Sequence, residues 1–264
     1  MDHVDFLGSD LASIAAEKAA IQKPGIPSVI GAQPPEAARV IQEYADRVGA
    51  PLARHDVEWG VQGAEDGVRV RFGSKIREFP TPALIGAHQI HNAGLAIACT
   101  EFLKDFKITN AAIAQGMRRV EWPGRLQRLQ GGPLVSILPA DCDVWLDGGH
   151  NPSAGEALAV MAREWRDRPL HLIIGMLNTK DKSGFLRPLA PLVATMQTVT
   201  VPNTEASVSA EDLARDGRAL HVKATAAPNL EAAAQNLSDI IKGPARVLIC
   251  GTLYLAGAVL TQNG

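Results

Sequence analysis

Apolar residues recur at helical spacing through much of the first half of the chain. Ser9 and Asp10 are typical helix N-caps, and the apolar stripe that follows them predicts a helix ending near Lys23. Lys18 falls on this stripe, where a core residue is expected. The other elements expected here are a strand over 28–31, helices over 35–48, 87–103 and 110–120, and a β-hairpin over 67–72 and 75–79.

The pattern changes at Trp122-Pro123-Gly124-Arg125, and beyond it strands alternate with helices. Such alternation is typical of a mostly parallel sheet with helices on both faces. It predicts a Rossmann-like α/β domain over 125–264, preceded by a separate domain over 1–124. The expected strands lie near 134–138, 143–147, 170–175, 196–201, 219–223 and 245–250, and the expected helices begin at Pro152, Asp181, Ser209 and Asn229.

Composition narrows the function classes. The 264 residues are 46% hydrophobic and 20% charged, which describes a globular chain, and the net charge of −2 provides no basic field for nucleic acid or an anionic membrane. No apolar run approaches the roughly 20 residues of a membrane span, and the N-terminus lacks the pattern of a secretory signal. We therefore expect a cytoplasmic protein without nucleic-acid or membrane partners.

The most suggestive chemistry follows the strand expected at 143–147. Asp147-Gly148-Gly149-His150-Asn151-Pro152 supplies a carboxylate, two glycines, an imidazole and a Pro-led helix start. Because ligands of open parallel sheets bind at the carboxyl ends of strands, these residues are candidates for a ligand site. A capped strand-to-helix turn, with Asn151 as N-cap and Asp147 hydrogen-bonded nearby, explains the same residues.

Lys18 also has two interpretations. Its ammonium group can extend to the edge of the apolar stripe and remain in water. Alternatively, desolvation lowers a lysine pKa and leaves a neutral amine, which can take up carbon dioxide to form an anionic carbamate. A carbamate could ligate or orient Mg²⁺, which prefers oxygen donors. His3, just upstream, is a candidate metal ligand or an ordinary surface or core histidine.

Asn92 and Arg125 are weaker candidates when each is taken alone. Asn92 is a polar residue in an otherwise apolar helical pattern, where its amide could read the edge of a nucleobase. Arg125 follows Pro-Gly at the domain boundary, where it could reach a phosphate or ribose. Most arginines in such places pair only with surface carboxylates.

Taken together, these stretches resemble the folylpolyglutamate synthases and dihydrofolate synthases of the wider Mur ligase type. The resemblance covers essentially the whole chain, with the motifs in the family's order. The matching motifs are Asp2-His3 with Phe6-Leu7-Gly8, Glu17-Lys18-Ala19 with Lys23-Pro24-Gly25, Asn92-Ala93, Pro123-Gly124-Arg125, Asp147 to Pro152, Gly175-Met176 with Lys180-Asp181, and Gly251-Thr252-Leu253-Tyr254 with Gly257.

The resemblance implies the remnant of a P-loop ATPase domain followed by a Rossmann-like ligase domain. It implies an ATP- and Mg²⁺-dependent ligase that joins L-glutamate to dihydropteroate, to folates or to both through an acyl phosphate. By motif position, His3 is the family's magnesium-binding histidine and Lys18 its carbamylated, catalytic lysine. Asn92, Arg125 and Asp147 match the residues that contact ATP. His150 lies beside them with a supporting catalytic role, and the full-length enzyme is expected to be a monomer.

One departure from the family pattern limits this expectation. Members carry a phosphate-binding loop of the Gly-Thr-Asn-Gly-Lys-Gly-Ser kind upstream of Asp-His, and nothing in these 264 residues resembles it. We therefore expect an N-terminally truncated ligase that is inactive alone. The alternative is a non-catalytic nucleotide- or folate-binding module, or the partner of a separately encoded P-loop half. A nicotinamide-dependent oxidoreductase is disfavoured because no Gly-x-Gly-x-x-Gly follows a first strand.

Overall fold

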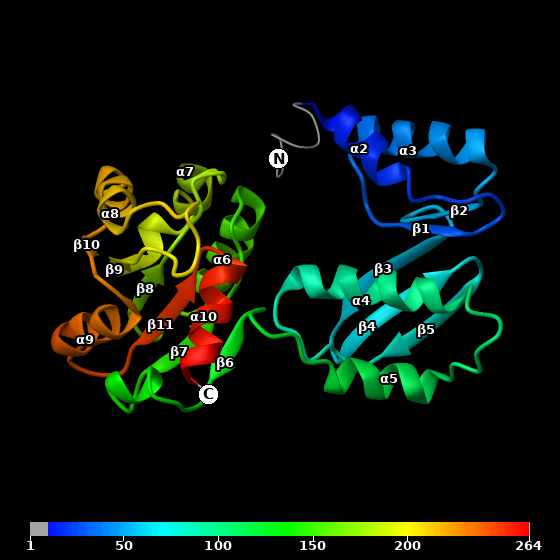
Figure 1. The fold of residues 1–264 in the computed structure, drawn as a ribbon. Coiled ribbons are helices and arrows are strands. Elements are labelled where there is room, and N and C mark those ends of the chain that lie inside the picture. Colours follow the sequence, from blue (N-terminus) through cyan, green and yellow to red (C-terminus); the bar gives the residue numbers. More distant parts are fainter. Residues whose placement is uncertain (1–9, 264) are drawn as a thin grey trace. The chain divides into compact units, whose positions relative to one another are not determined.

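The computed structural model describes residues 10–263 and divides into two compact units, residues 1–121 and 122–264 (Figure 1). The division lies within three residues of the boundary expected at 124/125. The mixed α/β fold class and the mostly parallel sheet of the second part are confirmed.

The first unit combines a short parallel sheet with an antiparallel meander. Its elements are α2 (Leu11–Ala19), β1 (Ser28–Ile30), α3 (Pro35–Val48), β2 (Leu52–Arg54), β3 (Trp59–Ala64), β4 (Gly67–Phe72), β5 (Lys75–Phe79), α4 (Ala87–Thr100) and α5 (Asn110–Arg119). Strands β1 and β2 pair in parallel, and β3-β4-β5 is the expected hairpin extended by one strand. Helices α2 and α3 pack against each other, and α4 packs on β3 and β4 (Figure 1).

The second unit is built on a six-stranded sheet of order β10-β9-β8-β11-β7-β6. All neighbours in it are parallel except β6, which runs antiparallel to β7 at the edge. Its elements are β6 (Gln127–Leu129), η1 (Val135–Ile137), β7 (Asp143–Leu146), α6 (Pro152–Glu164), β8 (Leu170–Ile174), α7 (Lys182–Leu186), η2 (Ala190–Leu192), β9 (Val193–Thr198), α8 (Ala210–Ala219), β10 (Ala224–Ala226), α9 (Leu230–Ile240), β11 (Arg246–Cys250) and α10 (Leu253–Asn263).

Two apolar cores cover the two faces of this sheet. Helices α9 and α10 bury Leu237 and Val259 against one face, and α6, α7 and α8 bury Leu158, Phe185 and Leu213 against the other (Figure 1). This arrangement is the one expected for helices that connect parallel strands. Within residues 10–263, no helix is long and apolar enough to span a bilayer.

Several expected elements differ from the structure. The first helix ends at Ala19 instead of Lys23. The chain forms turns at residues 20–21 and at Pro24-Gly25, and neither continues the helix. The strand expected at 134–138 is wrong: this apolar run contains the 3₁₀ helix η1. The strand expected at 219–223 is also displaced, since α8 continues to Ala219 and β10 begins at Ala224.

Candidate functional site

The carboxyl ends of β7 and β11 bring two loops of the second unit together. The two strands are parallel neighbours, and Gly251 N–H donates to the Gly149 carbonyl at 3.1 Å. Asn151 caps α6 by accepting from Ala154 N–H at 2.9 Å, and Pro152 occupies the first helical position. The loop from Asp147 to Asn151 is thereby fixed at both ends.

Asp147 connects this loop to the segment that carries Arg125. Its side chain is buried, with 8% of the residue exposed. Oδ1 accepts from Gly149 N–H at 2.7 Å, and Oδ2 accepts from Leu126 N–H at 2.8 Å. These contacts support the interpretation of Asp147 as part of a hydrogen-bonded turn, and its contact with a nucleotide stays a prediction.

Gly148 permits close packing at the centre of the loop. A Cβ atom at this position would lie 2.3 Å from Leu253 Cδ2, so a larger residue would displace the start of α10. Gly148 N–H also donates to the Gly124 carbonyl at 2.7 Å. The half-buried His150 ring turns back on the same residue, with Nδ1–H donating to the Gly148 carbonyl at 3.1 Å. The Arg125 turn, the β7 loop and α10 therefore form one packed site.

Cys250 lies at the end of β11, beneath these loops. Burial raises the pKa of its thiol well above the usual range, and the Asp147 carboxylate raises it further. The thiol is therefore protonated and belongs to the core, as expected for a structural cysteine.

Arg125 is half-buried at the rim of this packed site. Across residues 10–263 its guanidinium takes part in no ion pair and no hydrogen bond. Other arginines of the same unit are paired, for example Arg128 with Asp143 and Arg246 with Asp167. Arg125 thus retains all its N–H donors for an anionic ligand. The structure brings together three predicted site residues, Arg125, Asp147 and His150.

Asn92 belongs to the first unit and lies on α4. It is exposed, and its Nδ2 donates to Gln89 Oε1 at 3.0 Å. The buried positions of α4 are Gln89, Gly94, Ile97 and Ala98. Asn92 is accordingly on the solvent-facing side of the helix, where its amide is accessible to a ligand.

Of the two interpretations of Lys18, the structure agrees with the one in which its ammonium group remains in water. The buried side of α2 consists of Ala15 and Ala19, and Lys18 is exposed. The described residues therefore do not shield the Lys18 amine from water. A carbamate at Lys18 stays a prediction that rests on the family resemblance alone. His3 lies outside the described residues.

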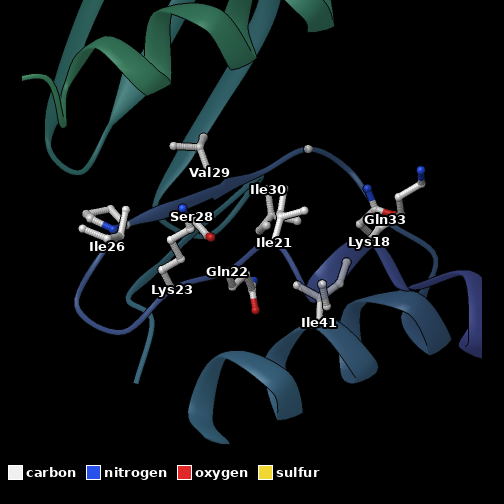
Figure 2. Close-up of a pocket in the computed structure, with 13 residues that line it drawn as sticks. Lys18, Ile21, Gln22, Lys23, Ile26, Ser28, Val29, Ile30, Gln33 and Ile41 are labelled. Carbon is white, nitrogen blue, oxygen red and sulfur yellow. The ribbon is translucent and has the colours of Figure 1, made fainter. Parts of the chain in front are cut away.

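A pocket of about 510 Å³ opens in the first unit between α2, β1 and α3 (Figure 2). Ile21, Ile30 and Ile41 contribute apolar walls, and Lys18 lies at one side. Gln22 is 7% exposed, and within residues 10–263 neither the nitrogen nor the oxygen of its side-chain amide has a hydrogen-bond partner. Sequence reasoning missed Gln22, although its spacing of three residues from Ala19 and seven from Ala15 continues the buried stripe of α2.

No group of three or more His, Cys, Asp or Glu side chains in residues 10–263 is arranged to hold a metal ion.

Residues 124–253 match the family described as "Mur ligase, glutamate ligase domain". Over 98% of its length the chain is 30% identical to folylpolyglutamate synthase from Lacticaseibacillus casei, of which it covers 59%.

Solved structures agree with this match. The chain resembles Mycobacterium tuberculosis folylpolyglutamate synthase complexed with ADP, with a TM-score of 0.85, 29% identity and coverage of 100% of this chain and 61% of that one. It also resembles E. coli FolC in complex with DHPP and ADP, with a TM-score of 0.82, 26% identity and coverage of 99% and 58%. The chain spans about three fifths of the length of these relatives. Residues 124–253 thus match the glutamate ligase domain of Mur ligases, and the proteins that the chain resembles over nearly its whole length are folylpolyglutamate and dihydrofolate synthases.

Proposed function

We propose that this chain contributes the glutamate ligase domain and part of the ATPase domain of an ATP-dependent ligase. The reaction joins L-glutamate to dihydropteroate, to a folate or to both. The observation that carries the proposal is that the Arg125 guanidinium has no ion pair or hydrogen bond within residues 10–263, while the neighbouring Gly124 carbonyl accepts from Gly148 N–H in the β7 loop at the carboxyl edge of the sheet. In open α/β sheets this edge is where ligands bind, and an arginine there suits phosphate oxygens.

The chemistry needs an activated carboxylate. A carboxylate oxygen of the pterin substrate bonds to the γ-phosphorus of ATP, and the bond to the ADP oxygen breaks. The glutamate amine then forms a C–N bond with the acyl carbon, inorganic phosphate leaves with the former carboxylate oxygen, and the nitrogen loses a proton. Arg125 would stabilise negative charge on the nucleotide, with Asn92 and Asp147 as further contacts and His150 in a supporting role.

Mg²⁺ belongs to the proposal as the usual counter-ion of ATP. When bound, it would offset negative charge on the phosphates of ATP. His3 as its ligand and Lys18 as a catalytic carbamate are proposed from motif position alone. A cytoplasmic location and a monomeric full-length enzyme belong to the same proposal.

Nucleotide binding is the first prediction. We expect the purified chain to bind MgADP in calorimetry, and Arg125→Ala to weaken binding about tenfold or more, since a charge-assisted hydrogen bond contributes about 1.5–3 kcal/mol. Arg215→Ala is the matched control, because Arg215 is exposed on α8 and pairs only with Asp212. Equal affinities for wild type and Arg125→Ala would remove the observation that carries the proposal.

Ligation is the second prediction. The 264 residues contain no glycine-rich phosphate loop, so we expect no glutamate addition when the chain is incubated with MgATP, dihydropteroate and L-glutamate. Adding the part of the Lacticaseibacillus casei enzyme that this chain does not match should restore product in a chromatographic assay, and Arg125→Ala should abolish it. Turnover by the unsupplemented chain would contradict the first expectation.

The pocket at Gln22 favours a second candidate function, a module that pairs with a separate P-loop half. Strand β1 pairs only with β2 among residues 10–263, so its other edge is available to a further strand. The unpartnered Gln22 amide is complementary to a peptide group. This module would be favoured if the chain binds MgADP but forms no product, either alone or with the added part of the Lacticaseibacillus casei enzyme.

A further inference from the structure

Main-chain groups on both sides of Arg125 are held by hydrogen bonds. Arg125 N–H donates to the Trp122 carbonyl at 3.3 Å, and Gly124 N–H donates to Gln127 Oε1 at 3.0 Å. The Gly124 carbonyl accepts from Gly148 N–H at 2.7 Å. The backbone is therefore fixed immediately before Arg125.

Leu126, immediately after Arg125, has an unusual backbone conformation. Its φ is 42°, in the left-handed region that costs about 1 kcal/mol or more for a residue with a side chain. Its side chain is 5% exposed and packs in the core formed with α6 to α8. Such a conformation persists only where neighbouring groups hold it.

Asp147 supplies that restraint. Its Oδ2 accepts from Leu126 N–H at 2.8 Å, while Oδ1 is held by Gly149 N–H at 2.7 Å. The carboxylate is buried, so both bonds form away from competing water. A carboxylate is also repelled by phosphate, whereas it attracts main-chain N–H dipoles.

We propose that Asp147 is a positioning residue, whose carboxylate holds residues 124–126 so that the Arg125 guanidinium is presented to an anionic ligand. The ligand class is a phosphate-bearing nucleotide, and in this respect the inference rests on the proposed function. This positioning role of Asp147 is additional to the direct contact with the nucleotide that the proposed function gives it.

Amide hydrogen exchange tests the restraint without any ligand. In the Asp147→Asn variant the side chain keeps its shape, but an NH₂ group that only donates replaces one of the two acceptor oxygens. We expect amide exchange at Leu126 N–H or Gly149 N–H, measured by NMR, to become roughly 10- to 100-fold faster, because one hydrogen bond to a charged group is lost. The backbone order parameter of Arg125 should also fall. Unchanged exchange and an unchanged order parameter would overturn the proposal.

A matched control separates this local effect from general destabilisation. Asn229 caps α9 in the same unit and accepts from Ala232 N–H at 2.8 Å. Asn229→Ala is expected to lose about 1 kcal/mol of stability and to leave the exchange rates at Leu126 and Gly149 unchanged relative to global unfolding.

A double-mutant cycle on MgADP affinity tests the route through Arg125. Asp147→Asn and Arg125→Ala should each weaken binding about tenfold or more, and the loss in the double variant should be clearly smaller than the product of the two single losses. If the two losses multiply, Asp147 and Arg125 act independently and the inference is wrong. If the wild-type chain binds no MgADP, the proposed function fails, and the exchange rates and order parameter still decide the role of Asp147.

Discussion

His171 lies on β8 inside the second unit, with 6% of the residue exposed, and its Nδ1 is 2.8 Å from Thr195 Oγ1. Burial lowers its pKa below the ordinary value of 6.5, so between the two values the unfolded chain binds more protons than the folded one. The free energy of unfolding should therefore fall as the pH drops through 6.5, and His171 should contribute no pH dependence above that value.

The measurement is denaturant unfolding of wild type and His171→Gln at several pH values between 5 and 8. This range includes the ordinary histidine pKa of about 6.5. The variant should show a shallower decrease on the acid side. His221→Asn is the control, because His221 is exposed at a left-handed φ of 62° that asparagine tolerates. An identical acid-side slope for wild type and His171→Gln would contradict the prediction.

At the residue scale, sequence reasoning placed Asp147 and His150 just after a strand, and β7 does end at Leu146, because strand ends and Pro-Gly turns are local signals. The roles of Asp147, His150 and Arg125 as site residues stay predictions. It left two interpretations of Lys18 open, and the structure agrees with the exposed one, since the buried side of the short helix that carries Lys18 consists of two alanines. The role of Asp147 needed three dimensions: its contact with Leu126 spans 21 residues, and no spacing rule predicts it.

At the element scale, Gly251 controls the turn from β11 into α10. Its φ is 117°, and a Cβ atom would lie 2.4 Å from the Gly175 carbonyl oxygen. Gly251→Ala should lower the free energy of unfolding by about 3 kcal/mol, through backbone strain and overpacking. Gly257→Ala is the control within α10, where an added Cβ meets nothing within 4 Å.

In the same denaturant titration, Gly257→Ala should be neutral or more stable by about 0.5–1 kcal/mol, since alanine favours the helix. Equal unfolding midpoints for the two alanine variants would show that Gly251 is not required by the turn.

The elements that sequence patterns predicted best are those with strong local signals. Asn151, Asp181, Ser209 and Asn229 all cap the helices expected after them. The failures have physical reasons. The apolar run at 134–138 is too short to distinguish strand from helix, and β3 contains two glycines, which are unusual in a strand.

At the scale of the whole molecule, the two units differ in how completely their sheets are covered. Both faces of the second sheet are buried by helices, and its two cores lie entirely within residues 126–259. In the first unit, β1 has one strand partner among residues 10–263, and the nearby Ile21 and Ile26 are 80% and 58% exposed. The Pro-Gly signal predicts a boundary at 124/125, three residues from the observed division, but the pairing of β1 depends on contacts that sequence patterns do not encode.

The second unit should therefore fold by itself. We expect a fragment of residues 122–264 to unfold in one cooperative transition, with a midpoint close to that of the same unit in the whole chain, because its core contacts are all retained. A fragment of residues 1–121 should be loosely packed or aggregate, since its free strand edge and exposed isoleucines favour association. Hydrogen exchange on the whole chain provides the comparison: protection should be markedly higher in the second unit. Uniform protection across both units would show that the first is as stable as the second and that its open pocket costs it little.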